Sequence, residues 1–231
     1  MSEWVSETWP LYGGEKLTLA PGEVHFWRLL PESDFVQFLP PHERSRHDRM
    51  THAENQSGYA MSQGGLRRIA SLYLERDWRG VDVLRRERGK PYIIEAPEFN
   101  LSHTVGQVYA AFSSHAVGLD IESVDRRVNA PDLAQKYFSP IEAAHIAAQP
   151  ENRINALFLR YWVCKEATVK LSGDGIYHGL RDAEISLGTD GWSEGFYRGR
   201  KVRIREFRLS AQLMGALAAW DTFSVKGFFR I

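Results

Sequence analysis

The chain has 231 residues and only one cysteine, Cys164. A disulfide within the chain is therefore impossible, and a zinc site built on several cysteines cannot form. Such scarcity of cysteine is typical of proteins from a reducing compartment, and it predicts a cytoplasmic location.

An excess of charge is also missing, since 29 Lys and Arg residues balance 29 Asp and Glu residues. Dedicated nucleic-acid binders usually carry a basic footprint, so we expect no nucleic-acid partner. Long apolar runs are missing too, because Met214–Trp220 is far shorter than a membrane span. The segment Met1–Pro10 lacks the charged-then-apolar pattern of a signal peptide. We therefore expect no membrane partner.

What is present is an ordinary globular composition, with 43% apolar residues in a length that suits one large domain or two small ones. Helical and strand patterns are mixed without strict alternation, which predicts an α+β fold with mainly antiparallel sheet. The expected helices cover 34–39, 59–76, 130–138 and 153–171, with a helix or irregular segment at 42–52. The expected strands cover 24–30, 99–103, 108–113, 117–124, 202–209, 213–220 and 222–229.

Two local signals sharpen these expectations. Gly64 and Gly65 interrupt a helical pattern, which predicts close packing or a kink. The run from Ser139 to Glu142 has proline at the first helical position and the spacing of a capping box. A helix is therefore expected to begin there.

Acidic residues stand at two points of otherwise apolar segments. Asp120 and Glu122 are two apart in a predicted strand, so both carboxylates share one face. Such a pair suits a hard divalent cation, although from these residues alone the solvated face of an edge strand is the commoner explanation. Glu166 and Lys170 share one face of the predicted helix. An exposed ion pair would explain them, but their helix is too apolar to be exposed all round.

A third group of polar residues lies earlier in the chain. Ser102 and His103 are neighbours at the end of a predicted strand, where adjacent side chains point in opposite directions. No Gly-x-Ser-x-Gly turn accompanies them, which argues against a hydrolase nucleophile. Both residues, and Lys90 in the turn Gly89-Lys90-Pro91, are equally compatible with a structural role and with phosphate binding.

The order of these motifs is more specific than any one of them. The series is Gly-Lys-Pro at 89–91, Asn-Leu-Ser-His at 100–103, Gly-Leu-Asp-Ile-Glu at 118–122, Phe-Ser-Pro-Ile-Glu at 138–142 and Trp-Val-Cys-Lys-Glu-Ala-Thr-Val-Lys at 162–170. It resembles the 4′-phosphopantetheinyl transferases of the larger, surfactin-synthetase-activating type. The resemblance implies an enzyme that transfers the 4′-phosphopantetheine arm of coenzyme A to a serine hydroxyl of an apo acyl or peptidyl carrier protein. It also implies Mg²⁺ dependence and release of 3′,5′-ADP.

The resemblance implies a fold as well. It predicts two similar, pseudo-symmetric α+β halves in a monomer, covering 1–115 and 116–231, with coenzyme A bound between them. The C-terminal half would carry the metal and the catalytic helix.

Residue roles follow from the same resemblance. Asp120, Glu122 and Glu166 match the magnesium ligands, and Glu166 is also the expected general base, acting directly or through water. Lys170 matches the lysine at the reacting phosphate. The residues expected at the other coenzyme A phosphates are Lys90, Ser102 and His103, with Arg44 and Arg46 near the 3′-phosphate.

The chain departs from the family pattern at Gln63, where an arginine is expected. This departure predicts altered contacts to the 3′-phosphate. The carrier would be acidic, and Arg126-Arg127 is either part of its docking patch or a solvated turn, the commoner case. Tyr137 and Phe138 are either core or part of the same patch.

Two other functions remain open at this point. A coenzyme A-binding module without catalysis would explain Gln63, but it would not need the acids and the lysine. A magnesium-dependent coenzyme A hydrolase would need the acids, but it would not explain the ordered series of motifs.

Overall fold

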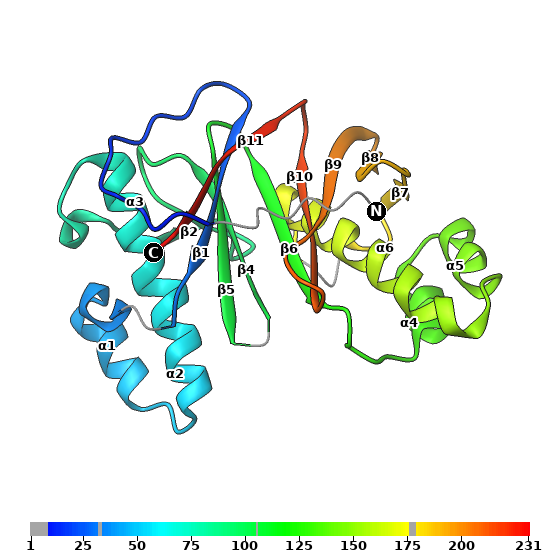
Figure 1. Cartoon of the computed structure of the whole chain (residues 1–231), viewed down its shortest axis with the longest axis horizontal. Coiled ribbons are helices and arrows are strands. Elements are labelled where there is room, and N and C mark those ends of the chain that lie inside the picture. Colours follow the sequence, from blue (N-terminus) through cyan, green and yellow to red (C-terminus); the bar gives the residue numbers. More distant parts are fainter. Residues whose placement is uncertain (1–8, 32–33, 105, 176–178) are drawn as a thin grey trace. The chain divides into compact units, whose positions relative to one another are not determined.

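The computed structural model describes residues 9–31, 34–104, 106–175 and 179–231 (Figure 1). The chain divides into two compact units. The N-terminal unit contains the described residues up to His115 together with Phe223–Ile231, and the C-terminal unit contains Ala116–Thr222. The expected halves 1–115 and 116–231 therefore differ from the structure at the end of the chain, because the final strand pairs with the sheet of the N-terminal unit.

The N-terminal unit is built on a sheet with the strand order β11-β1-β5-β4. The strands are β1 (Glu23–Leu29), β4 (Glu98–Thr104), β5 (Gln107–Ser113) and β11 (Ser224–Arg230). Strand β5 is antiparallel to both of its neighbours, whereas β11 runs parallel to β1. The two short strands β2 (Leu84–Arg85) and β3 (Pro91–Tyr92) form a separate hairpin.

Helices of this unit follow one another closely. They are η1 (Phe35–Phe38), α1 (Pro41–Asp48), α2 (Ala53–Ala60), the π-helical η2 (Met61–Gly65), α3 (Leu66–Leu74) and η3 (Trp78–Gly80). Side chains at Gly64 and Gly65 would collide with Phe35 and Leu29. The expectation of close packing at this pair is confirmed, and the π-helical turn is the local irregularity.

The C-terminal unit contains an antiparallel sheet with the order β6-β10-β9-β8-β7. The strands are β6 (Val117–Ser123), β7 (Ala183–Ser186), β8 (Trp192–Tyr197), β9 (Arg200–Arg208) and β10 (Leu213–Ala219). The helices are α4 (Ala130–Tyr137), α5 (Pro140–Ala147) and α6 (Glu151–Ser172). The capping box expected at the start of α5 is present, since Ser139 and Glu142 exchange hydrogen bonds.

Helix α6 packs against β6 and β10 and forms the centre of this unit (Figure 1). Its contact with β6 depends on Gly118, because a Cβ atom there would collide with the backbone carbonyl oxygen of Ala167. The helix ends at Gly173, whose left-handed conformation (φ 81°) is one that glycine adopts readily. The close approach at Gly118 brings the following residues of β6 next to the last turns of α6.

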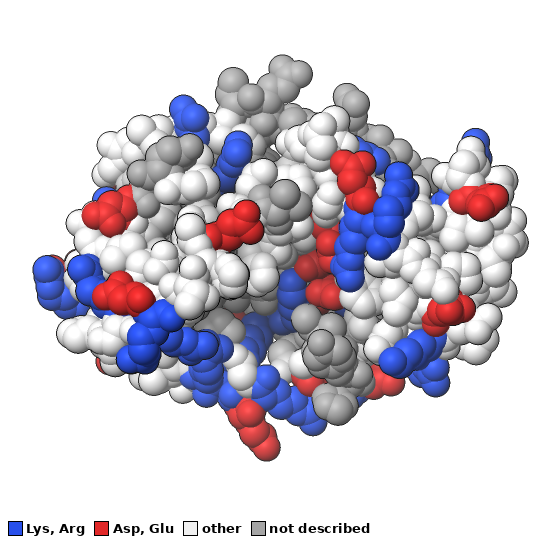
Figure 2. Space-filling view, turned by 90° about the horizontal axis from the view of Figure 1, so that it is seen from below, with Lys and Arg blue, Asp and Glu red and all other residues white. Residues whose placement is uncertain are grey.

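Each unit has its own hydrophobic core. The expectation of an α+β fold with mainly antiparallel sheet is confirmed, and the β1–β11 pair is the parallel exception. In the described part of the chain, no helix combines the length and apolar character that crossing a bilayer requires. Figure 2 shows Lys and Arg side chains interspersed with Asp and Glu side chains on the face that it draws, in keeping with the balanced charge.

Candidate active site

The acids and the lysine singled out in the sequence meet within the C-terminal unit. Asp120 and Glu122 come from β6, and Glu166 and Lys170 come from α6. Lys170 Nζ donates to Asp120 Oδ1 at 2.6 Å and lies 3.7 Å from Glu166 Oε2. One ammonium group therefore contacts carboxylates from both elements.

This cluster is withdrawn from solvent. The side chain of Asp120 is 4% exposed and that of Glu166 is 12% exposed. Strand β6 does lie at the edge of its sheet, but α6 packs against it. The solvated-strand explanation for Asp120 is therefore wrong, and so is an exposed ion pair for Glu166 and Lys170.

Burial and crowding shift the pKa values of the acids. Burial raises the pKa of Glu166 well above its usual range, repulsion from Asp120 and Glu122 adds to the rise, and Lys170 opposes it. Burial also raises the pKa of Glu122, together with the charge of Asp120. Such perturbation by burial and specific neighbours is typical of functional sites.

The pKa of Lys170 is raised as well, which for a lysine favours the charged form. Burial is the largest single influence and lowers its pKa, but the attraction of Asp120 and Glu166 outweighs it, and the net pKa is raised. The ammonium form is therefore the one that this environment favours. A fixed positive charge in a partly buried site is well suited to bind a phosphate group.

Arg126 forms a further contact of the cluster that the sequence did not reveal. Its guanidinium is paired with Glu122 and lies 5.2 Å from the centre of the Trp162 ring. The solvated-turn explanation thus fails for Arg126, although Arg127 is exposed. Arg126 belongs to the turn after β6. The periodicity of helices and strands does not apply there, so it does not predict that the Arg126 side chain pairs with Glu122.

The donor set fits a magnesium ion in its chemistry. Three carboxylates come from the adjacent elements β6 and α6, and burial together with their mutual repulsion raises the pKa of Glu166 and Glu122. Carboxylate oxygens are ligands that Mg²⁺ prefers. Among the described residues, however, no group of three His, Cys, Asp or Glu side chains is arranged to hold a metal ion. Asp120 and Glu122 instead contact Lys170 and Arg126.

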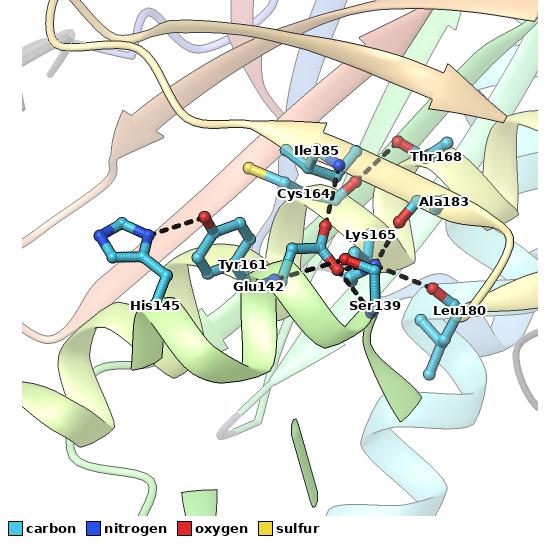
Figure 3. A network of polar contacts seen from close by, with 10 residues as sticks. All are labelled: Ser139, Glu142, His145, Tyr161, Cys164, Lys165, Thr168, Leu180, Ala183 and Ile185. Atoms are coloured by element: carbon cyan, nitrogen blue, oxygen red, sulfur yellow. Dashed lines mark hydrogen bonds and ion pairs between the residues drawn. The ribbon is translucent and has the colours of Figure 1, made fainter. Parts of the chain in front are cut away.

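Lys165 of α6 is the centre of a second charged network, with partners from other elements than those of Lys170 (Figure 3). Lys165 is fully buried, and its Nζ lies 2.8 Å from Glu142 Oε2 and donates to the carbonyl oxygen of Leu180 at 3.0 Å. Glu142 also accepts from the backbone N–H groups of Ser139 and Ile185, at 2.9 and 2.8 Å. This network ties α6 to α5 and β7, and it holds the helix that carries Glu166 and Lys170.

The other predicted site residues lie in the N-terminal unit. Ser102 and His103 are neighbours on β4, where Ser102 is buried and His103 is exposed. Lys90 directly precedes β3, and burial lowers its pKa to about 8. Arg46 is exposed on α1, with its guanidinium 5.4 Å from the centre of the Tyr59 ring. Their roles stay predictions.

Two arginines of the N-terminal unit are held by neighbouring residues. Arg67, one helical turn further on, is buried and forms a two-pronged ion pair with Glu43 at 2.6 and 2.9 Å. Arg44 donates to the carbonyl oxygen of Val36 at 2.7 Å. Both arginines therefore have partners within the unit.

Comparison with known proteins agrees with the motif series. The family model of the 4′-phosphopantetheinyl transferase superfamily matches residues 116–216. The 4′-phosphopantetheinyl transferase HetI of Nostoc sp. is 33% identical over 183 residues, which cover 74% of this chain and 77% of the relative. The chain belongs to the 4′-phosphopantetheinyl transferase superfamily.

Other relatives support this membership. The 4′-phosphopantetheinyl transferase Sfp of Bacillus subtilis is 28% identical over 159 residues, or 68% of this chain and 70% of that protein. The transferase psf-1 of Bacillus pumilus is 38% identical over 105 residues, or 45% and 44%. The expectations of this family and of a transferase enzyme are confirmed. The matched range 116–216 contains Asp120, Glu122, Glu166 and Lys170.

Proposed function

We propose that this phosphopantetheinyl transferase moves the 4′-phosphopantetheine arm of coenzyme A to a serine hydroxyl of an apo acyl or peptidyl carrier protein, and that it depends on Mg²⁺. The observation that carries the proposal is the cluster of Asp120, Glu122, Glu166 and Lys170 at the contact of β6 with α6, in which Asp120 and Glu166 are buried and Glu122 and Lys170 are partly buried. It lies within the range that matches the family model. The family membership supplies the transferred group.

In this proposal, Asp120, Glu122 and Glu166 hold the magnesium ion. When bound, the ion neutralises charge on the pyrophosphate of coenzyme A. The three carboxylates are suited to this task because burial and mutual repulsion leave the site short of positive charge. Arg126 and Lys170 supply part of that charge in the structure described here.

The chemical step is assigned to residues of α6. Glu166 would accept the proton of the carrier serine, either directly or through a water molecule. The serine oxygen would form the new bond to phosphorus as its proton passes to Glu166, and 3′,5′-ADP would leave with the electron pair of the broken P–O bond on its phosphate oxygen. The Lys170 ammonium would lie beside the reacting phosphate, where negative charge develops.

The N-terminal unit is proposed to bind the other phosphates of coenzyme A. Lys90, Ser102 and His103 supply donors there, and Arg46 lies exposed on α1. Gln63 cannot supply the positive charge that an arginine would bring. We therefore expect the 3′-phosphate to be held more weakly than in relatives with that arginine.

The test measures the intact mass of small apo carrier proteins after incubation with the full-length protein, coenzyme A and Mg²⁺. The expected result is a gain of one phosphopantetheine group that EDTA abolishes. Failure to modify any carrier, with coenzyme A binding retained, would support a non-catalytic binding module instead. Release of phosphopantetheine without a carrier would support a hydrolase.

A further inference from the structure

Arg126 contacts the candidate active site, but the proposed reaction gives it no role. We propose that Arg126 is the resident counter-cation of Glu122, and that a divalent metal ion displaces it on entering the acid cluster. The proposal rests on the metal site assigned above. It concerns how this chain exchanges an internal cation for an external one.

The backbone of Arg126 is held in place, so the exchange needs a movement of the side chain only. Its backbone N–H donates to the carbonyl oxygen of Ser123 at 3.2 Å. Its own carbonyl oxygen accepts from Asn155 Nδ2 of α6 at 3.0 Å. The turn after β6 is thereby fastened to α6 at the level of the backbone.

The guanidinium of Arg126 already contacts an aromatic ring while it is paired with Glu122. Arg126 lies 5.2 Å from the centre of the Trp162 ring, a distance at which a cation is attracted to an aromatic face. Its side chain is 36% exposed, compared with 16% for that of Glu122. A guanidinium that leaves Glu122 therefore retains the indole and gains contact with water.

Lys170 is less suited to be the cation that leaves. Its ammonium contacts both Asp120 and Glu166, and its side chain is only 20% exposed. It also emerges from the buried part of α6 rather than from a turn. Arg126 is thus the more readily displaced of the two internal cations.

Formal charges favour the exchange. Asp120, Glu122 and Glu166, if all ionised, carry three negative charges against the two positive charges of Lys170 and Arg126. A divalent cation in the place of Arg126 brings the positive total to three. The cluster then balances without a guanidinium, which is free to rest against Trp162.

The test compares Mn²⁺ binding by the full-length protein and two variants, without coenzyme A, by electron paramagnetic resonance. Arg126→Gln is expected to bind Mn²⁺ about three- to fivefold more tightly than the natural sequence, as expected for removal of a partly exposed ion pair. Arg127→Gln removes the same charge from the exposed neighbouring residue. It is expected to stay within about twofold, in keeping with screening of exposed charges.

A second measurement separates displacement from a general charge effect. In side-chain ¹⁵N spectra, the Arg126 Nε signal, identified by its absence in Arg126→Gln, is expected to shift when Mg²⁺ is added. Thermal unfolding with and without Mg²⁺ shows that each variant is folded, and Mg²⁺ should raise the Tm of Arg126→Gln more than that of the natural sequence.

The outcomes are distinguishable. Mn²⁺ binding by the natural sequence with equal or weaker binding by Arg126→Gln would overturn the role of Arg126 alone. An unmoved Arg126 signal at saturating Mg²⁺ would do the same. No Mn²⁺ binding by either protein without coenzyme A would overturn the exchange of cations, whereas the proposed transfer would still be decided by the carrier-mass measurement.

Discussion

The two sides of α6 hold buried charges in different balance. On one side, Lys165 faces Glu142, and backbone groups from Leu180 and Ile185 complete the hydrogen bonds of the pair. On the other side, Lys170 is shared by Asp120 and Glu166. Lys165 and Glu166 are adjacent in sequence, yet their surroundings differ in kind; Figure 3 shows those of Lys165.

The difference separates a structural pair from a reactive site. A buried pair with complete hydrogen bonding has little left to offer a ligand. Burial and repulsion raise the pKa of Glu166 and Glu122, and a cation that binds beside these carboxylates stabilises their charged forms. Substitutions on the two sides should therefore affect different measurements.

The largest expected effect is on catalysis. Glu166→Gln keeps the shape of the side chain but removes its charge and its ability to accept a proton. We expect the rate of phosphopantetheine transfer, followed by carrier mass, to fall about a thousandfold. The free energy of unfolding should be maintained or raised, because the substitution relieves repulsion with Asp120 and Glu122.

The matched control is Glu151→Gln, the same substitution at an exposed position of the same helix. It should leave both the transfer rate and stability close to those of the natural sequence. Near-normal turnover by Glu166→Gln would contradict the assignment of the proton acceptor.

The next effect is on stability. Glu142→Gln leaves the Lys165 ammonium fully buried without its carboxylate. We expect a loss of about 3 kcal/mol in the free energy of unfolding, measured with urea, because a broken buried pair leaves an uncompensated charge. Replacing both partners, as Glu142→Gln with Lys165→Met, should recover part of that loss.

The folded fraction of Glu142→Gln should bind Mn²⁺ like the natural sequence, because the substitution lies on the other side of α6. A changed metal affinity in the folded protein would show that the two networks are not separate. Unfolding and metal binding must therefore be measured on the same samples.

Local patterns predicted much of this arrangement. The spacing of Asp120 and Glu122 placed both carboxylates on one face of a strand, and the run from Ser139 to Glu142 predicted the start of α5. The burial of Asp120 could not be predicted in this way. It depends on the close contact between Gly118 and Ala167, which are far apart in sequence.

Other features depend on long-range pairing or on turn geometry. Strand β11 was expected, but its parallel pairing with β1 joins opposite ends of the chain. The partner of Arg126 depends on the path of the turn after β6. Glu142 was recognised as a capping residue, but its pairing with Lys165 needed the packing of α5 on α6.

Lys90, which is partly buried, extends the comparison to the N-terminal unit. Burial lowers the pKa of Lys90 to about 8, and burial also lowers that of Lys165. If Lys90 binds a phosphate of coenzyme A, its ammonium form is the one that binds. Affinity for coenzyme A should then be steady below about pH 7 and fall severalfold between pH 7 and pH 9.

Isothermal titration of coenzyme A at several pH values checks this expectation. Lys90→Gln should bind more weakly at pH 7 and should lose the decline above pH 8. A decline of the same size in Lys90→Gln would assign the pH dependence to another group. Lys165, which pairs with Glu142, should contribute to stability and not to coenzyme A binding.

The smallest expected effect concerns a hydrogen bond between Tyr161 of α6 and His145 of α5. Tyr161 shares a hydrogen bond of 3.0 Å between its Oη and His145 Nδ1. Tyr161→Phe should lower the free energy of unfolding by only about 0.5–1 kcal/mol, with the transfer rate unchanged. His145 is exposed, so water can replace the lost partner, whereas water cannot reach the fully buried Lys165. Urea unfolding of Tyr161→Phe, His145→Ala and the double variant measures the interaction free energy between the two side chains. A value of about 3 kcal/mol would contradict the view that exposure makes this contact weaker than the pair of Lys165 and Glu142.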